Sequence, residues 1–263
     1  MTAVAAAAAP VSTAPPAVQL RGIDKRFGAV HANRAVDLTV PTGTIHGIVG
    51  ENGAGKSTLM SILYGFYQAD AGQIAIDGAS ATIRGSHDAI ARGVGMVHQH
   101  FMLVDTLSAL DNIMLGAEPH WQLDRARAQV RAKLEPLMAG SGLHVNLDAP
   151  VADLPVGERQ RLEILKTLYR GAHILILDEP TAVLTPAEIE ALFHTLRGLR
   201  ERGTTILLIT HKLKEILALC DNVTVMRAGA VVLDTAIADT SLDGLAEATV
   251  GRRVNLGREG ATT

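Results

Sequence analysis

The segment from Gly50 to Ser57 reads GENGAGKS and constrains the fold more than any other part of the chain, because it matches the pattern G-x-x-x-x-G-K-[ST]. It stands between a short apolar run, Ile45 to Val49, and a helical stretch from Thr58 to about Tyr64. Glycines at this spacing let the backbone curl so that N–H groups point at phosphate oxygens, and the following helix turns its positive end to the same anion. The pattern predicts a phosphate-binding loop; a glycine-rich turn with a chance lysine is the alternative.

Two residue types in this loop indicate what it would hold. The Lys56 ammonium can reach β- and γ-phosphates, and the Ser57 hydroxyl can ligate Mg²⁺.

A second candidate site, which is acidic, follows the apolar run Ile174 to Leu177. Here Asp178 can hold Mg²⁺ through water, and Glu179 can polarise an attacking water. Solvated acids at a strand end are the alternative interpretation of this pair, and the phosphate loop upstream argues against it.

Apolar runs and helical periods alternate at both ends of the chain, with a helical block between them. This order predicts an α/β nucleotide-binding core with a helical insertion over about residues 104–170. Strands are expected at Val18 to Ile23, Val36 to Val40, Ile45 to Val49, Ile74 to Asp77, Gly95 to His98, Ile174 to Leu177 and Ile206 to Ile209. Helices are expected at Thr58 to Tyr64, Thr106 to Leu115, Arg125 to Ala139, Glu158 to Tyr169, Pro186 to Glu201 and Lys212 to Leu219.

Composition excludes several protein classes. The 263 residues are 48% hydrophobic and 19% charged, so the chain can bury a core and is not disordered as a whole. A net charge of −3 gives no global basic field for nucleic acid, and Cys220 alone cannot form an internal disulfide. Residues 1–17 are rich in alanine and proline, which predicts a disordered tail, with a short targeting segment as the alternative.

The stretch from Leu154 to Gln160 lies between the phosphate loop and the acidic pair Asp178–Glu179. With these three features together, the chain resembles the ATP-binding subunits of ABC transporters over about residues 18–255. Phe27 stands where that family has an aromatic ring that stacks on adenine. Gln99 matches a glutamine that senses Mg²⁺ and the permease. Gly157 matches the signature glycine that caps the γ-phosphate of the ATP held by the opposite subunit, and His211 matches a histidine that contacts the γ-phosphate.

The resemblance implies a P-loop NTPase (RecA-like) core with an antiparallel β subdomain and an inserted helical subdomain, a tail at 1–17, a domain at 18–255 and a tail at 256–263. It implies ATP and Mg²⁺ as cofactors. The catalytic residues would be Glu179, His211 and Gln99, and the metal ligands Ser57, Gln99 and Asp178. The nucleotide-binding residues would be Phe27, Gly50, Glu51, Asn52, Gly53, Ala54, Gly55, Lys56, Ser57, Thr58, Asp178, Pro155, Val156, Gly157 and Glu158.

Other interpretations stay open for some of these residues. Phe27 alone could be an ordinary core residue. His98 and His100 are expected to be polar neighbours of Gln99, since no cysteine or carboxylate is spaced to complete a zinc site with them. The charged stretch from Arg125 to Lys133 is expected to be a solvated helix face.

Three stretches are similar to nucleoside and simple-sugar importers, and most of all to the purine nucleoside branch: Val97 to Val104, Leu154 to Gly157, and Asp178 to Pro186. Those proteins usually fuse two ATP-binding domains, and this chain resembles the first half. The second half is then either encoded elsewhere or missing from this sequence.

Two positions depart from the wider family. Pro155 stands where the signature usually has Ser, and Thr185 stands where the loop after the catalytic Glu usually has Asp. Both departures affect the ATP site that this chain would complete for its partner, and neither affects the site built on Lys56.

The resemblance therefore implies the ATP-hydrolysing motor subunit of a bacterial importer for nucleosides or simple sugars. Its expected partners are transmembrane permease subunits, a second ATP-binding domain (a homodimer or a related half) and, indirectly, a solute-binding protein, with no nucleic acid. Its expected location is the cytoplasmic face of the inner membrane, as a peripheral subunit. A soluble ABC ATPase that acts on DNA or the ribosome is the alternative, and a non-hydrolysing regulatory domain is a third class.

Overall fold

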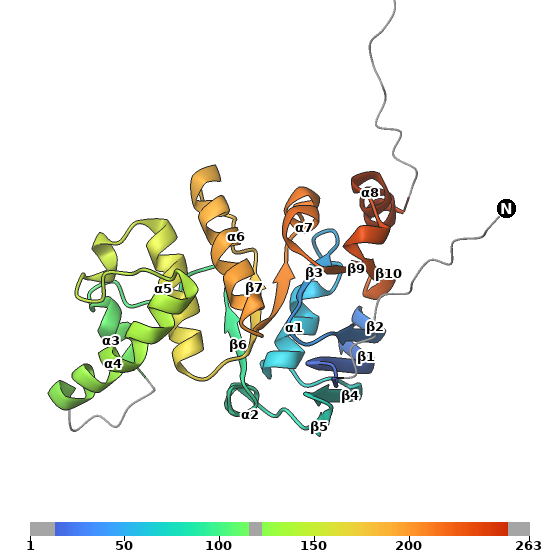
Figure 1. Cartoon of the computed structure of the whole chain (residues 1–263). Helices are drawn as coiled ribbons and strands as arrows, with labels where there is room; N and C mark the ends of the chain where they lie inside the picture. Colours follow the sequence, from blue (N-terminus) through green and yellow to red (C-terminus); the bar gives the residue numbers. More distant parts are fainter. Residues whose placement is uncertain (1–13, 116–122, 252–263) are drawn as a thin grey trace, which may run out of the picture.

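A computed structural model describes residues 14–115 and 123–251 of the chain. Its larger sheet has six strands, of which five run parallel and β10 pairs antiparallel to β9. Across the sheet the strands are β10 (Ala230–Ala236), β9 (Asn222–Arg227), β3 (Ile45–Val49), β8 (Thr205–Ile209), β7 (Ile174–Asp178) and β6 (Val94–Val97). Figure 1 shows this sheet in the middle of the molecule, with helices on either side.

The central strands are apolar throughout because both faces of this sheet are covered. In β7, Ile174 and Ile176 face one core, whereas Leu175 and Leu177 face another, and all four are fully buried. Strand β8 alternates in the same way. The period-2 pattern of each strand thus divides its side chains between two layers.

The first of these layers lies between the two sheets of the fold. The smaller sheet is antiparallel, with the order β2 (Val30–Val40), β1 (Val18–Phe27), β4 (Ala71–Ile76) and β5 (Ala79–Ala81). Helix α1 (Lys56–Tyr64) packs into the same core through Leu59, Met60 and Leu63. The helix that follows the glycine-rich loop is therefore fixed by buried apolar contacts.

The second layer holds the helices that follow β6 in the chain. Between β6 and β7 lie α3 (Ala109–Met114), α4 (Leu123–Ser141), the short 3-10 helix η1 (Val151–Asp153) and α5 (Val156–Tyr169), on the opposite side of the molecule from β1 and β2 (Figure 1). Leu134 of α4 and Leu162 of α5 are fully buried in the layer's core. Along α4, Arg127 and Arg131 pair with Asp111 and Asp148, and both arginines keep a large exposed fraction.

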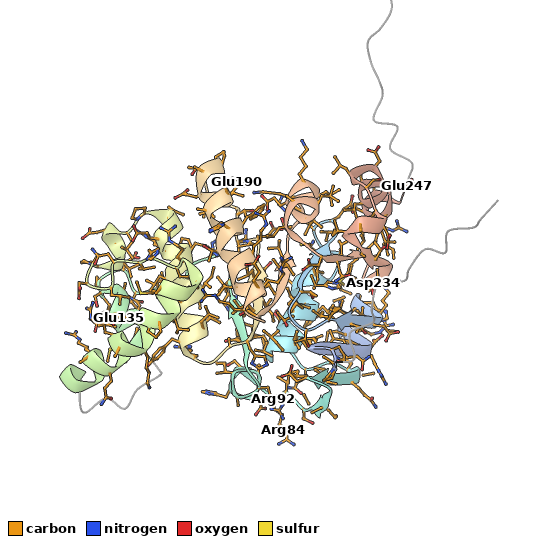
Figure 2. The ribbon with its side chains drawn as sticks, in the orientation of Figure 1. Arg84, Arg92, Glu135, Glu190, Asp234 and Glu247 are labelled. Atoms are coloured by element: carbon orange, nitrogen blue, oxygen red, sulfur yellow. The ribbon has the colours of Figure 1, made fainter. Side chains whose placement is uncertain are left out.

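The remaining helices are α2 (Ser86–Ala91), α6 (Pro186–Glu201), α7 (Leu213–Leu219), the 3-10 helix η2 (Ile237–Asp239) and α8 (Leu242–Val250). Helices α6 and α7 cover the sheet on the side away from β1 and β4 (Figure 1). Charged side chains such as Glu135 on α4 and Glu190 on α6 lie at the periphery (Figure 2). No helix within the two described ranges is both long and apolar enough to cross a bilayer.

The architecture expected from the sequence is confirmed: an α/β core with a parallel sheet, an antiparallel β subdomain and an inserted helical subdomain. The bounds of β3 and α6 agree with those expected. Seven elements within the described ranges were not expected, namely β5, α2, η1, β9, β10, η2 and α8. Strand β9 reads NVTVMR, and its polar Thr224 is buried against His46, so hydropathy alone does not reveal it.

Most of the expected N-terminal tail, residues 1–13, lies outside the described residues, as does the expected tail at 256–263. Ala17 is fully buried, and its carbonyl oxygen accepts a hydrogen bond from the backbone N–H of Asp77 at 3.0 Å. Packing therefore begins just before the expected domain boundary at Val18.

Candidate functional site

A cavity of about 610 Å³ lies beside the glycine-rich loop and the end of β7. It gathers residues from six separate parts of the chain. They are Phe27, Ala29, Val30, His31, Ala32 and Arg34; Asn52 to Thr58; Gln99; and Asp178, Glu179, Ile209 and Ala228. The sequence-predicted nucleotide and metal residues that lie apart from this lining are Gly50, Glu51 and the signature residues from Pro155 to Glu158.

The loop has the curled backbone that its glycines predict. Gly55 caps the start of α1 at a φ of 99°, and a Cβ at this position would lie 2.3 Å from the carbonyl oxygen of Ala32. A larger residue would therefore clash with backbone as well as strain the left-handed conformation. The first N–H groups of α1 open toward the cavity that Lys56, Ser57 and Thr58 line.

The Lys56 side chain lies within the loop. Its Nζ donates hydrogen bonds to the carbonyl oxygens of Gly50 at 2.7 Å and Glu51 at 3.0 Å, and the residue is 7% exposed. Burial lowers the pKa of this ammonium, and the nearby carboxylates of Glu179 and Asp178 oppose the shift. The positive charge is thus held at the point where a phosphate chain would enter the loop.

The acidic pair stands across the cavity from this ammonium. Asp178 is the last residue of β7, and burial together with the Glu179 charge raises the pKa of its carboxyl group. Glu179 has a φ of 47°, a left-handed conformation that is uncommon for a residue with a side chain. Its N–H donates to the carbonyl oxygen of Ile209 at 2.9 Å, which ties the strained residue to the neighbouring strand β8.

His211 and Glu179 are brought together although they lie on different segments. Nδ1 of His211 lies 2.8 Å from Oε1 of Glu179, and the Thr210 hydroxyl lies 3.3 Å from the other carboxylate oxygen. The side chain of Glu179 is 13% exposed, whereas that of His211 is 58% exposed. The pair therefore presents an oriented carboxylate and an accessible imidazole at one edge of the cavity.

Phe27 and Gln99 complete the predicted lining. Phe27 is 41% exposed, so it is not an ordinary core residue, and its ring centroid lies 5.1 Å from that of Tyr67 in an edge-on arrangement. The Lys25 ammonium lies 5.3 Å from the same ring centroid, and the exposed part of the ring suits stacking against a planar base. Gln99 follows β6 and reaches the cavity from the side of the helical subdomain.

The cavity contains an oxygen-donor set that fits Mg²⁺: the Ser57 hydroxyl, the Gln99 amide and the Asp178 carboxylate all line it. Across the described ranges, no three His, Cys, Asp or Glu side chains cluster as a metal centre. His98 stacks on Phe66 with centroids 5.5 Å apart, and burial lowers the pKa of its imidazole.

The signature segment lies at the start of α5, where Pro155 is the N-cap and is exposed. The Gly157 N–H donates to Oε1 of Glu188 at 3.0 Å. The other oxygen of Glu188 accepts hydrogen bonds from the Thr185 N–H and hydroxyl, both at 2.8 Å, and these bonds hold the pKa of Glu188 below its usual range. Glu188 thus joins Gly157 of the signature to Thr185, one of the two positions that depart from the wider family.

Sequence reasoning missed Glu188 and, on the β1–β2 side of the cavity, every lining residue except Phe27. The pattern Thr185-x-x-Glu188 is a capping box, a signal that was available but predicts the start of α6 and not a contact with the signature. His31 lies 2.9 Å from an Asp24 oxygen across the antiparallel pair, and both Arg34 and His31 line the cavity. No motif marks these residues.

Comparison with known proteins places these observations in context. The sequence profile of the family described as ABC transporter matches residues 33–182. The chain is 49% identical over 236 residues to a ribose import ATP-binding protein of Burkholderia thailandensis, and 46% identical over 238 residues to a nucleoside import ATP-binding protein of Lactococcus lactis. It is 43% identical over 270 residues to a glucose import ATP-binding protein of Haloferax volcanii. These alignments cover 89%, 90% and 92% of this chain, and 47%, 47% and 49% of the three proteins, so the chain spans about half of their length.

Solved structures share the fold. The chain is similar to the cbiO1 protein of Clostridium perfringens, part of an ABC transporter complex, with a TM-score of 0.76 and 26% identity over 92% of this chain and 95% of that one. It is also similar to an ATP-binding cassette in its ADP conformation, with a TM-score of 0.77 and 24% identity over 90% of this chain and 99% of that one.

Proposed function

The chain belongs to the ABC transporter family, and from that premise we propose that it is the ATP-hydrolysing motor subunit of an importer for nucleosides or simple sugars. One observation carries the proposal: Lys56, Asp178 and Glu179 line one cavity, and His211, which lies outside that lining, contacts Glu179. The relatives named above are import proteins, which supports an importer over a soluble ATPase that acts on DNA or the ribosome.

ATP is the proposed ligand of this cavity. The Gly53 to Thr58 backbone and the Lys56 ammonium would hold its phosphates, and the exposed Phe27 ring would hold its base. Ser57, Gln99 and Asp178 would hold Mg²⁺, which supplies charge neutralisation between the phosphates when bound.

Glu179 is the proposed general base. Its Oε2 and Oε1 are oriented by Thr210 and His211, so the carboxylate is held in place to accept a proton from a water that attacks the γ-phosphorus. His211, being the exposed member of the pair, would donate toward the γ-phosphate from the same edge. Lys56 would stabilise the charge that develops on the phosphate oxygens.

A second ATP-binding domain is the proposed partner for the signature. Residues Pro155 to Glu158 lie apart from the Lys56 cavity, so they cannot cap a nucleotide bound in the same subunit. They would cap the nucleotide of a partner, either a second copy or a related half. The relatives are about twice as long as this chain, which supports a related half.

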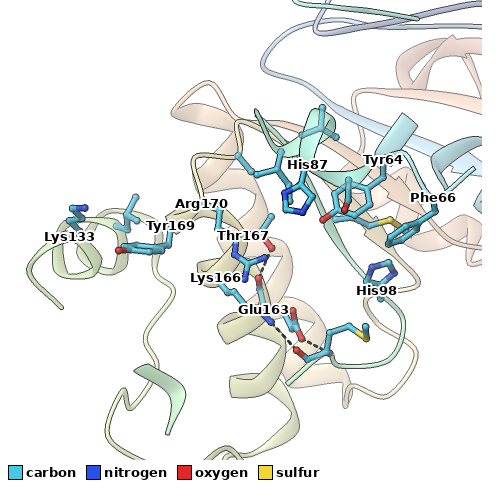
Figure 3. A pocket seen from close by; sticks show the side chains of 18 residues that line it. Tyr64, Phe66, His87, His98, Lys133, Glu163, Lys166, Thr167, Tyr169 and Arg170 are labelled. Carbon is cyan, nitrogen blue, oxygen red and sulfur yellow. Dashed lines mark hydrogen bonds between the residues drawn. The ribbon is translucent and has the colours of Figure 1, made fainter. Parts of the chain in front are cut away.

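Transmembrane permeases are the other proposed partners, with a solute-binding protein acting through them. A second cavity of about 770 Å³ adjoins Gln99's segment and is lined by Tyr64, Phe66, His98, Met102 and Tyr169 among others (Figure 3). Phe66 is 51% and Met102 is 64% exposed, so the cavity offers apolar contacts to a short cytoplasmic segment of a permease. This pairing would place the chain peripherally at the cytoplasmic face of the membrane.

The transported solute is proposed from resemblance and from the relatives' names, because no residue of this chain would touch it. Uptake of a labelled nucleoside and of labelled ribose, in cells with and without the gene, tests the assignment. We expect deletion to abolish uptake of one of the two solutes, and the Lys56→Ala gene to fail to restore it. Unchanged uptake of both would contradict the solute class and leave the ATPase assignment to be judged in vitro.

A further inference from the structure

The backbone of Met102 is bonded at both its N–H and its carbonyl group to one helix, α5. Its N–H donates to Oε1 of Glu163 at 2.5 Å, and its carbonyl oxygen accepts a hydrogen bond from Lys166 Nζ at 2.9 Å. Glu163 and Lys166 stand one turn apart on α5 and point together at the segment that runs from Gln99 to Val104, as the dashed lines in Figure 3 mark. The two peptide groups that flank the Met102 Cα are thus bonded to charged groups of opposite sign.

The burial of these groups shows that the contact is built into the fold. Glu163 is 5% exposed, although a buried carboxylate is costly without hydrogen-bond partners. Burial also lowers the pKa of Lys166, and the Glu163 charge opposes that shift. The Met102 side chain is 64% exposed, so α5 holds the backbone of this segment and not its side chain.

The other end of the same segment is attached elsewhere. His98, the residue before Gln99, stacks on Phe66 at 5.5 Å and meets Tyr64 edge-on at 6.3 Å. Tyr64 is the last residue of α1, the helix that begins with Lys56. Gln99 is therefore suspended between an anchor on the phosphate-loop helix and an anchor on α5.

We propose that Glu163, assisted by Lys166, is a positioning residue that couples Gln99 to the signature. Glu163 lies seven residues after Val156 on the continuous helix α5, about 10 Å along its axis. A displacement of the Gln99 segment is then transmitted through the backbone hydrogen bonds of Met102 to α5, and along α5 to its start, where Val156 and Gly157 lie. The inference rests on the proposed function, because it assumes that nucleotide reaches Gln99.

The test compares Glu163→Ala with Glu163→Gln, which keeps a carbonyl oxygen that can accept from Met102 N–H, and with Glu135→Ala, which removes an exposed carboxylate from α4 (Figure 2). Hydrogen exchange of the full chain is measured with and without a non-hydrolysable ATP analogue. We expect Glu163→Ala to lose at least about fivefold protection at the Met102 amide, because an amide left without its acceptor exchanges faster.

The coupling itself is measured at the signature. In the wild type, Glu163→Gln and Glu135→Ala, the analogue is expected to protect residues 156–160, whereas in Glu163→Ala this protection is lost. The dissociation constant of the analogue stays within about threefold in all four proteins, and kcat for ATP falls about tenfold in Glu163→Ala with little change in KM. If Glu163 only stabilised the fold, Glu163→Ala would not lose the protection of residues 156–160 while still binding the analogue with nearly unchanged affinity.

Each outcome decides between the two claims. If the wild type fails to bind the analogue, the proposed function fails. If the wild type binds it and Glu163→Ala still protects residues 156–160, or the wild type shows no protection there, the coupling role is wrong. If Glu163→Ala does not fold, Lys166→Ala, which leaves the buried carboxylate in place, takes its position in the test with the same expected loss of coupling.

Discussion

His211 Nδ1 lies 2.8 Å from Glu179 Oε1, and the two residues follow the neighbouring parallel strands β8 and β7. The contact depends on the left-handed backbone of Glu179, whose φ is 47° and whose N–H is bonded to Ile209. Because this hydrogen bond fixes the strained backbone of Glu179 to the sheet, its carboxylate meets the imidazole of His211 in a fixed geometry at the edge of the cavity.

Replacing Glu179 by glutamine is expected to separate binding from hydrolysis. The amide keeps the shape and can still pair with His211, but it cannot accept the proton of an attacking water. We expect ATP affinity within about threefold of wild type and turnover at least about a hundredfold slower. Size-exclusion chromatography should then reveal an ATP-stabilised dimer. An active Gln variant, or one unable to bind ATP, would refute the role assigned to Glu179.

Pro155 predicts a weakened signature. It has neither an N–H nor a hydroxyl to donate to a γ-phosphate, and it stands exposed at the N-cap of α5. The isolated chain is therefore expected to bind ATP but to hydrolyse it well below the ~10 s⁻¹ typical of enzymes. Pro155→Ser, whose hydroxyl can donate, should raise this rate.

A partner domain with Ser in its signature provides the second arm of that test. It should restore hydrolysis at the site built on Lys56, while the site capped by Pro155 stays slower. Full activity of the isolated wild-type chain, unchanged by Pro155→Ser, would mean that the proline is harmless and that the two sites are not asymmetric.

Thr185 has a structural role that its position in the wider family does not suggest. Its hydroxyl accepts from the Glu188 N–H at 3.4 Å and donates to the Glu188 carboxylate at 2.8 Å, which caps α6. Thr185→Ala is expected to lower the free energy of unfolding by about 1 kcal/mol. The melting temperature would fall by about 2–4 °C.

Two variants serve as controls for this prediction. Thr185→Ser keeps the hydroxyl, and Glu190→Ala changes an exposed side chain of α6 (Figure 2). Both should melt within roughly 1–2 °C of wild type, as expected of surface changes. Equal losses in all three variants would contradict the cap.

Phe27 should contribute to nucleotide affinity through its exposed ring. Loss of one base-stacking contact costs about 1–3 kcal/mol, so Phe27→Ala is expected to raise the dissociation constant of ATP about tenfold. Phe27→Tyr retains the aromatic face and should bind within about twofold of wild type. Isothermal titration calorimetry measures both. An alanine variant with wild-type affinity would show that the ring serves the contact with Tyr67 instead.

The parts of the fold that the sequence predicted are those with local causes. Strand β3, the loop to Ser57 and α1 follow from one apolar run, three glycines and a helical period within 20 residues. Helix α6 begins with a capping box and has Pro186 at its first position, so the four residues from Thr185 to Glu188 indicate its start.

The parts that the sequence did not predict depend on packing between distant elements. Glu188 reaches Gly157 across 31 residues because α5 and α6 pack together. Glu163 reads as one acid within a helical stretch, and its burial against Met102, 61 residues away, depends on where the Gln99 segment crosses α5. His31 enters the cavity only through the register of β1 and β2. No periodicity or spacing encodes these contacts.

Steady-state release of phosphate from Mg-ATP by the purified wild type and by Lys56→Ala tests the account most directly. The Lys56 ammonium is held inside the loop by the carbonyl oxygens of Gly50 and Glu51, and its removal takes away the charge that stabilises the transferring phosphate. The account predicts measurable hydrolysis by the wild type and a loss of at least about a hundredfold in Lys56→Ala, with an unchanged circular dichroism spectrum. Hydrolysis by Lys56→Ala within twofold of wild type would contradict it.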